Sequence, residues 1–373
     1  MRSKRNRITI KDVAKETGVS ISTVSNVLNK SRYVKKESPM HRGAPRRMKI
    51  MLFSRETEER ILEAVKKLNY RPNMVARGLR LKSTGSVAVI VPDISNPFFA
   101  EMVRDMENVA RELGYTLILC CTYYDTEEEE RQLNLLRDKW VDGFIFASGY
   151  NTDDHIAELM EQKIPVVAVD REITDFWVPS VLIDNVEAAK KAVDYLCQLG
   201  HKRIAYISFP YTNMKTVENR YLGYREGLRA NNIGYDPSLV LIAESLRMNE
   251  IKESYSILTN FLKLSQPPTA IFVMADLMAI GILRALKEMG LRVPQDISIM
   301  GFDNIAISAF TDPPLTTIKQ PKKKMGATAM QLLIDLIRHK RVEKKEILMS
   351  TEVVVRQSTG KVATTVRIPM FRK

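Results

Sequence analysis

The sequence predicts an α/β protein with a small all-helical N-terminal segment and a larger core of two doubly wound parallel-sheet lobes. Three observations predict this fold. After Gly85, apolar strand-like runs alternate with amphipathic helical patterns, which is typical of parallel sheets. The alternation begins again at "SVLID", residues 180–184, so we expect two lobes with a cleft between them. Before Gly85 the apolar residues recur at helical spacing instead.

The first predicted element is a pair of short helices in "ITIKDVAKETGVSISTVSNVLN". Thr9 is a suitable N-cap for the first helix, with Asp12 three residues later as its acidic partner. Gly18 interrupts the chain, and Ser20 can cap the second helix. The inward faces are expected to be Ile10, Val13 and Ala14, and then Val24, Val27 and Leu28. Two short helices around a glycine turn form a helix-turn-helix.

The outer face of the second helix is unusual for a solvent-exposed helix. It presents Ile21, Ser22, Ser25 and Asn26, where Glu and Lys would be ordinary. Short uncharged side chains can approach phosphates and base edges closely. This face is therefore suited to lie against a nucleic acid.

The charge distribution indicates the same kind of partner. Residues 1–82 contain 22 Lys and Arg against 7 Asp and Glu, whereas the remaining 291 residues contain 35 against 37. The whole positive excess of the chain lies in its first quarter. This split predicts a nucleic-acid-binding head on a nearly neutral body.

A third helix is predicted from about Glu56 to Asn69, with an inward stripe of Ile61, Leu62, Val65 and Leu68. After Pro72 comes "NMVARGLR", a short segment that contains a glycine and would be a marginal helix by itself.

Residues 8–34 and 54–82 resemble the DNA-binding headpiece and hinge of the lactose/galactose repressor family of bacterial transcription regulators. The matching stretches are "TIKDVAKETGVSISTVSNVLN", "ERILEAVKKLNYRPN" and "VARGLR", followed by "SNPFF". The resemblance continues to about Ser358 and so covers nearly the whole chain. It implies a core like the periplasmic binding proteins, a small effector, and repression of a carbohydrate-utilisation operon.

The resemblance assigns DNA-binding roles to individual residues. The second helix would lie in the major groove, with Ile21, Ser22 and Asn26 facing bases. The expected phosphate ligands are Thr9, Ser20, Thr23, Ser25 and Asn29. Asn73 and Ala76 would belong to a hinge helix that folds on the operator, and Leu79 would be an apolar wedge in the minor groove. A palindromic operator and paired hinges require a homodimer.

Two features depart from the family pattern. Asn26 occupies a position where many relatives carry Arg, and Asn pairs with adenine where Arg prefers guanine. The segment "KKESPMHRGAPRRMKIMLF", residues 35–53, interrupts the headpiece between its second and third helices. Its prolines, glycine and basic residues predict an extruded loop, which either adds phosphate contacts or is a passive insertion.

Ligands of doubly wound sheets bind at the carboxyl ends of strands. The candidate residues for an effector site therefore follow predicted strands, although helix capping is an alternative role for each carboxylate. They are Asp93, Ser95, Asn96, Asp170, Arg171, Asp276 and Asp303, with Arg220 in a loop before "YLGYREGL". The resemblance implies that Ser95, Phe98, Asp170, Arg220 and Asp303 line this site.

The class of effector stays open at this point. Phe98 could stack on the apolar face of a sugar. Ala275 departs from the family, which often has Asn before the residue that matches Asp276. Arg171 and Arg220 leave room for an acidic ligand such as a sugar acid, and a neutral sugar fits equally well.

The predicted domain organisation follows from these segments. The headpiece is expected at 1–70 with the insertion 35–53, the hinge helix and linker at 71–84, and the core at 85–358. The lobes are expected at about 85–183 plus 322–349 and about 184–321 plus 350–358, with "EILMSTEVVVRQSTG" as one last strand. A basic tail, 359–373, follows and contains no leucine heptad.

Several classes of protein are disfavoured. The sequence has no signal peptide and no apolar run of membrane-spanning length, so a cytoplasmic protein is expected rather than a secreted sugar-binding protein. It has no G-x-S-x-G, H-E-x-x-H, P-loop or Cys-x-x-Cys motif, and its three cysteines form neither a disulfide framework nor a metal site. We expect no enzyme, no cofactor and no metal.

Asn26→Arg tests the predicted base contact. Asn26 should favour an A·T pair in each half-site, and a good bidentate contact contributes roughly 1–3 kcal/mol of discrimination. The variant should shift that one pair toward G·C and leave the other positions unchanged. A binding selection on a randomised palindrome, run with both proteins, measures this, and identical base preferences would contradict the assignment.

Overall fold

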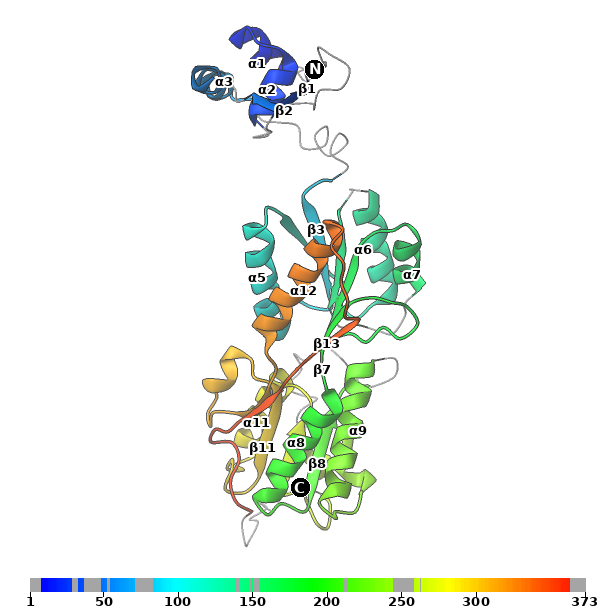
Figure 1. The fold of residues 1–373 in the computed structure, drawn as a ribbon. Helices are drawn as coiled ribbons and strands as arrows, with labels where there is room; N and C mark the ends of the chain where they lie inside the picture. Colours follow the sequence, from blue (N-terminus) through cyan, green and yellow to red (C-terminus); the bar gives the residue numbers. More distant parts are fainter. Residues whose placement is uncertain are drawn as a thin grey trace, which may run out of the picture. The chain divides into compact units, whose positions relative to one another are not determined.

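The computed structural model describes residues 8–28, 33–36, 48–51, 54–70, 83–138, 141–147, 149, 154–210, 214–243, 258–261 and 263–362. The chain divides between Thr84 and Gly85 into two compact units (Figure 1). The first is a helical headpiece, and the second is an α/β core with two sheets.

The headpiece contains α1 (Ile10–Thr17), α2 (Ile21–Leu28) and α3 (Arg55–Lys67). The predicted caps are confirmed. The Asp12 carboxylate accepts hydrogen bonds from the backbone N–H and the hydroxyl of Thr9, both at 2.8 Å. Gly18 ends α1 with a left-handed φ of 65°, and the Ser20 hydroxyl accepts the Thr23 N–H at 3.1 Å. These contacts satisfy N–H groups that a helix start leaves without intrahelical partners.

The buried residues of the headpiece core come from all three helices: Val13, Ala14, Val24, Val27, Ile61 and Ala64. The prediction for Leu62 is wrong, because its side chain is 44% exposed. Ala64 takes its place, since residues 61, 64, 65 and 68 share one helical face and residue 62 lies about 100° away from that face.

The predicted insertion is not wholly a loop. Strand β1 (Tyr33–Lys36) pairs antiparallel with β2 (Met48–Met51), and Tyr33 lies opposite Met51. Backbone pairing of the two strands brings the ends of the inserted segment together. Residues 37–47, between the strands, lie outside the described residues.

The first lobe of the core has a six-stranded sheet in which every neighbouring pair is parallel. Its strands, in spatial order, are β13 (Glu346–Met349), β7 (Ser180–Ile183), β6 (Val166–Val169), β5 (Phe144–Ala147), β3 (Ser86–Val91) and β4 (Thr116–Cys121). Its helices are α5 (Pro97–Glu112), α6 (Thr126–Asp138), α7 (Asp154–Glu161) and α12 (Lys322–Ile337). Figure 1 shows α5 and α12 side by side, and Gly326 of α12 allows close approach to the Met102 backbone of α5.

The second lobe has another six-stranded sheet, parallel except for β14 at its edge. In spatial order its strands are β14 (Glu352–Val354), β12 (Thr316–Lys319), β11 (Ser298–Asp303), β10 (Ala270–Val273), β8 (Ile204–Ser208) and β9 (Val240–Ile242). The helical elements are α8 (Asn185–Gln198), α9 (Lys215–Ala230), η1 (Pro237–Leu239), α11 (Asp276–Glu288) and η2 (Ala306–Ala309). All residues of β8, β10 and β11 are buried, because helices cover both faces of such sheets.

The chain passes between the lobes three times: after β7, after β12, and between β13 and β14. The prediction of one last strand is therefore wrong. Met349 pairs with Ile183 in the first sheet, whereas Glu352 pairs with Lys319 in the second. One apolar run serves two sheets, and this is why its pattern looked continuous.

Among the described residues, none of the helices has both the length and the apolar character that crossing a membrane requires. The three cysteines are unpaired and partly buried.

Helices α8 and α9 approach each other very closely. A Cβ atom added at Gly223 would lie 2.2 Å from the Val186 carbonyl oxygen, and one at Gly227 would lie 2.6 Å from Val193 Cβ. Since a backbone carbonyl cannot move aside cheaply, these two glycines set the distance between the helices.

Gly223→Ala should therefore destabilise the core, by about 1–3 kcal/mol, because the added methyl group forces the two helices apart. Gly234→Ala is the control, since a Cβ there has no neighbour within 4 Å. Urea unfolding measures both. Equal midpoints for Gly223→Ala and the parent protein would contradict the close-packing account.

Candidate functional site

The carboxyl ends of the two sheets present a buried group of charged side chains. Asp170 follows β6 in the first lobe, and Asp303 is the last residue of β11 in the second. Both have left-handed backbones, with φ of 51° at Asp170 and 110° at Asp303. Such conformations are costly for residues other than glycine and are found disproportionately at functional sites.

Arg220 is the cation of this group. The sequence placed it in a loop, but it lies within α9 and is 5% exposed. Its guanidinium donates from Nε to Asn185 Oδ1 and from Nη1 to the Met274 carbonyl oxygen, both at 2.9 Å. It also stacks on Phe302, 3.9 Å from the ring centroid, and Nη1 lies 3.7 Å from Asp303 Oδ1.

Asp303 is held by neighbours from the chain that follows β12. Gln320 Nε2 donates to Asp303 Oδ1 at 2.8 Å, and Lys322 Nζ donates to the Asp303 carbonyl oxygen at 2.8 Å. Burial raises the pKa of Asp303, and Arg220, Gln320 and Lys322 oppose that rise. The Asp303 carboxylate is thus fixed in place.

Asp170 differs from Asp303 in having an unpaired oxygen. Its side chain is 4% exposed, and Oδ1 has no hydrogen-bond partner. Burial raises the pKa of Asp170 to about 7; the charge of Arg220 opposes this shift, and those of Asp303 and Glu172 add to it. An unsatisfied buried acceptor is costly, so its presence points to a ligand that supplies the missing donor.

Asp276 is placed beside this group but is already saturated. It is fully buried and accepts hydrogen bonds from the Ile305 N–H at 2.9 Å, the Ser308 hydroxyl at 2.5 Å and the Thr317 hydroxyl at 2.6 Å. Burial raises its pKa to about 7. These contacts give Asp276 a structural role, anchoring η2 and β12 to the start of α11. Ala275, just before it, caps α11 without a side-chain hydrogen bond.

The structure places Arg171 in a different cluster. Its Nη1 donates to Glu129 Oε1 at 3.0 Å, and its guanidinium lies 5.5 Å from the Phe146 ring centroid. His155 Nε2 contacts the same Glu129 oxygen at 2.5 Å. Burial would raise the pKa of Glu129, but the His155 hydrogen bond and the Arg171 charge outweigh it, and the pKa is lowered. Arg171 is therefore committed to the interior of the first lobe.

The residues after β3 have mostly local roles. Asp93 accepts from the backbone N–H and the hydroxyl of Ser95, both at 2.8 Å, and Asn96 caps α5 through the Phe98 N–H. Ser95 is exposed. Phe98 is 3% exposed and packs edge-to-face on Phe99, with 5.1 Å between ring centroids. The interpretation of Phe98 as an open stacking surface is not supported by this packing.

Sequence reasoning missed Gln320, Lys322 and Tyr124. Gln320 directly follows β12, so the strand-end rule applied to that strand would have found it. Tyr124 follows β4 with a left-handed φ of 58°. Burial raises the pKa of Tyr124, and the charges of Asp93, Asp170 and Asp303 add to that rise, which places it beside the same group.

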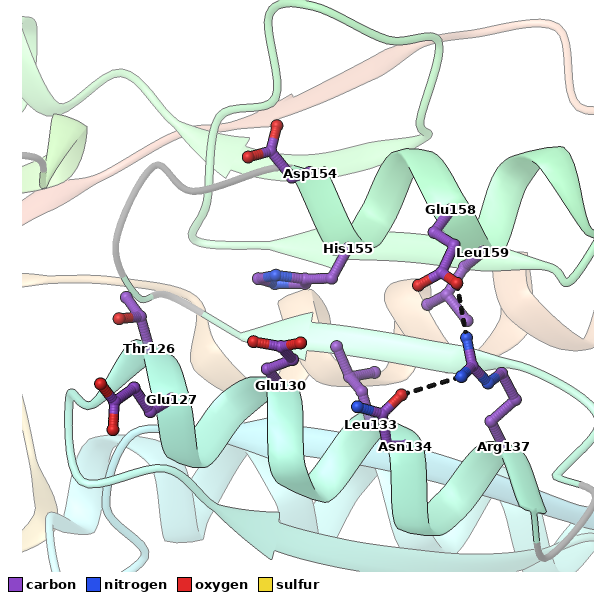
Figure 2. Close-up of a pocket in the computed structure, with 10 residues that line it drawn as sticks. All are labelled: Thr126, Glu127, Glu130, Leu133, Asn134, Arg137, Asp154, His155, Glu158 and Leu159. Carbon is purple, nitrogen blue, oxygen red and sulfur yellow. Dashed lines mark hydrogen bonds and ion pairs between the residues drawn. The ribbon is translucent and has the colours of Figure 1, made fainter.

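A separate groove of about 440 Å³ lies between α6 and α7. Figure 2 shows Glu127, Glu130, Asp154 and Glu158 along it, and Arg137 paired with Glu158 at 2.8 Å. The strand-end residues do not line this groove. In the part of the chain that the structure describes, no group of His, Cys, Asp or Glu is arranged to hold a metal ion.

In the headpiece, α2 presents a mixed outer face. Ile21 is 44% exposed, Ser22 is exposed and Asn26 is half-buried. Ser20 Oγ bonds to Ser22 Oγ at 2.7 Å and to Thr23 Oγ1 at 2.8 Å, and Thr9 is exposed at the start of α1.

One prediction for this face is wrong: Ser25 is only 8% exposed, because it lies beside Val24 on the inward side of α2. The predictions for Asn29, Asn73, Ala76 and Leu79 fall outside the described residues.

Comparison with known proteins gives a consistent result. Residues 9–39 match the model for bacterial regulatory proteins of the lacI family, and residues 193–359 match the periplasmic binding protein-like domain. The chain is 35% identical to the HTH-type transcriptional regulator RegA of Clostridium saccharobutylicum over 94% of this chain and 98% of that protein.

Two solved structures resemble the whole chain. The lac repressor dimer bound to operator and the anti-inducer ONPF has a TM-score of 0.78 at 27% identity and covers 95% of this chain and 100% of that one. The transcriptional regulator CelR in complex with cellobiose has a TM-score of 0.67 at 29% identity, with 94% and 100% covered.

Asp170→Asn tests whether this carboxylate is buried at a cost to the core. The pKa of Asp170 rises from 3.8 to about 7 in the folded protein. The folded state therefore holds the proton more tightly, and the free energy of unfolding falls as the pH rises between these two values. An amide carries no charge, so the variant should be more stable than the parent at pH 8, by on the order of a few kcal/mol.

The gain should shrink at pH 5, where Asp170 is largely protonated in the folded parent. Urea unfolding at both pH values measures the two differences. Asp175→Asn removes a carboxylate from the exposed end of the same loop and should change neither. A less stable Asp170→Asn protein at pH 8 would show that the carboxylate is satisfied after all.

Proposed function

The chain belongs to the LacI family of bacterial regulatory proteins, and on this premise we propose that it represses a carbohydrate-utilisation operon under the control of a small sugar or sugar-acid effector. Members of this family are DNA-binding transcription regulators with an effector-binding core, and not enzymes. We propose that the protein acts as a cytoplasmic homodimer on a palindromic operator.

The observation that carries the effector proposal is the group formed by Asp170, Arg220 and Asp303. Their burial, the two left-handed backbones and the unpaired Asp170 oxygen together favour a polar ligand bound between the lobes. The relatives support a carbohydrate, since CelR was solved with cellobiose and the lac repressor with the anti-inducer ONPF.

For the operator, we propose that α2 enters the major groove with Ile21, Ser22 and Asn26 toward the bases. Ser20, Thr23 and Thr9 lie exposed or half-exposed around the helix start, where phosphates are ordinarily held. The burial of Ser25 disfavours a phosphate contact by that side chain. The hinge roles of Asn73, Ala76 and Leu79, and the phosphate contact of Asn29, remain proposals from the family resemblance.

Arg220→Ala tests the effector site. The variant should bind the operator as the parent does but lose the effector's influence, because Arg220 compensates both carboxylates from the centre of the group. Asp303→Ala should behave in the same way. Fluorescence anisotropy on a selected operator, with and without a sugar that raises the melting temperature of the parent, measures both properties.

Arg225→Ala is the matched control, since Arg225 lies exposed on the same helix and its loss should preserve the effector response. A different outcome would refute the site assignment: weaker operator binding by the Arg220 and Asp303 variants, with the effector response intact in what remains.

A further inference from the structure

The site between the lobes has an imbalance of hydrogen-bonding groups, and we propose that it selects a neutral sugar with at least two hydroxyl donors and rejects the corresponding sugar acids and sugar phosphates. This inference rests on the function proposed above and narrows its effector to one chemical class.

The cations near the site already have protein partners. Arg220 donates to Asn185 and Met274 and stacks on Phe302. Lys322 Nζ donates to the carbonyl oxygens of Asp303 and Asn304, at 2.8 and 2.6 Å, and lies 3.5 Å from Glu101. An anionic ligand would have to compete for these donors.

Arg171, the remaining cation that an acidic ligand would need, is ion-paired with Glu129 and has a side chain that is only 1% exposed. Its commitment to that cluster removes the main sequence-based reason for expecting a sugar acid. The guanidinium beside Asp170 in the sequence does not make the site electropositive.

Two acceptors, by contrast, remain open. Asp170 Oδ1 and Gln320 Oε1 are buried atoms without a hydrogen-bond partner. The orientation of the Gln320 amide is settled by chemistry, because its Nε2 donates to Asp303 Oδ1 and the flipped amide would face two acceptors toward each other. The site therefore asks a ligand for donors.

The two open acceptors belong to different parts of the fold. Asp170 follows β6 of the first sheet, and Gln320 follows β12 of the second. A ligand that satisfies both must offer two donors, which adjacent hydroxyl groups of a sugar provide. A sugar carboxylate or phosphate would instead bring a third negative group to Asp170 and Asp303, which are both buried beside one guanidinium.

Discrimination of this kind is strong. A site built to hydrogen-bond a hydroxyl group rejects analogues that lack it, because buried acceptors are then left unpaired. Asp170 and Gln320 are therefore the specificity-determining residues that the structure assigns.

The test is isothermal titration of the full-length protein with matched sets: glucose, gluconate and glucose 6-phosphate; galactose and galacturonate; ribose and ribose 5-phosphate; cellobiose; and hypoxanthine as a neutral ring with N–H donors. The neutral member of one set should bind at least about 100-fold more tightly than its acid or phosphate. Singly deoxygenated forms of that sugar should identify two hydroxyls whose loss weakens binding by about tenfold or more.

Asp170→Asn keeps the size of the side chain and removes its charge. It should weaken binding of the neutral sugar and reduce the preference over the acid to less than about tenfold. Asp175→Asn, the exposed control, should keep the full preference. The deoxy-sugar series uses the unaltered protein and so stays decisive if the Asp170 variant does not fold.

Operator anisotropy with each ligand separates the two levels of the account. An acid or phosphate that binds as tightly as its neutral partner, and that shifts operator affinity, would overturn this inference and leave the proposed function standing. Binding by hypoxanthine alone would do the same to the sugar class. If no compound binds, the inference fails together with the effector function on which it rests.

Discussion

The architecture of the core depends on how a single guanidinium is held among buried carboxylates. Arg220 reaches them because α9 lies so close to α8, and Gly223 and Gly227, one and two turns further along α9, make that approach possible. The same approach brings Arg220 to Asn185 at the start of α8. Because burial would otherwise favour protonated carboxylates, the position of this cation determines how much charge the two sheet ends can carry.

The groups around Arg220 also connect the two lobes. Lys322, at the start of α12 in the first lobe, binds carbonyl oxygens at the end of β11 in the second. Glu101 of α5 accepts the Ala306 N–H of η2, and Asn219 of α9 donates to Glu172 beyond β6. A ligand among Asp170, Gln320 and Arg220 would thus contact segments that already join the lobes. Differential contacts of that kind are what allow a ligand to bias one arrangement of two lobes over another.

The sequence alone was enough to predict the alternation of strands and helices, the helix-turn-helix and the strand-end positions of Asp170 and Asp303, because these depend on local periodicity and on a general rule for parallel sheets. It could not show that Asp276 is saturated by Ser308 and Thr317, or that Arg171 pairs with Glu129, since both depend on partners distant in the chain. Arg220 looked like a loop residue because α9 begins with a polar turn, and Ser25 looked exposed because its residue type is polar.

The central claim is that Asp170 is an ionisable acceptor kept ready for a hydroxyl donor, and proton exchange on ligand binding tests it most directly. A hydroxyl that donates to the carboxylate favours its charged form and lowers a pKa that stands at about 7 in the empty site. Calorimetry of neutral-sugar binding at pH 7, in two buffers with different ionisation enthalpies, measures the protons exchanged. The account predicts a net release of protons that disappears in Asp170→Asn. Proton uptake, or an unchanged release in that variant, would contradict it.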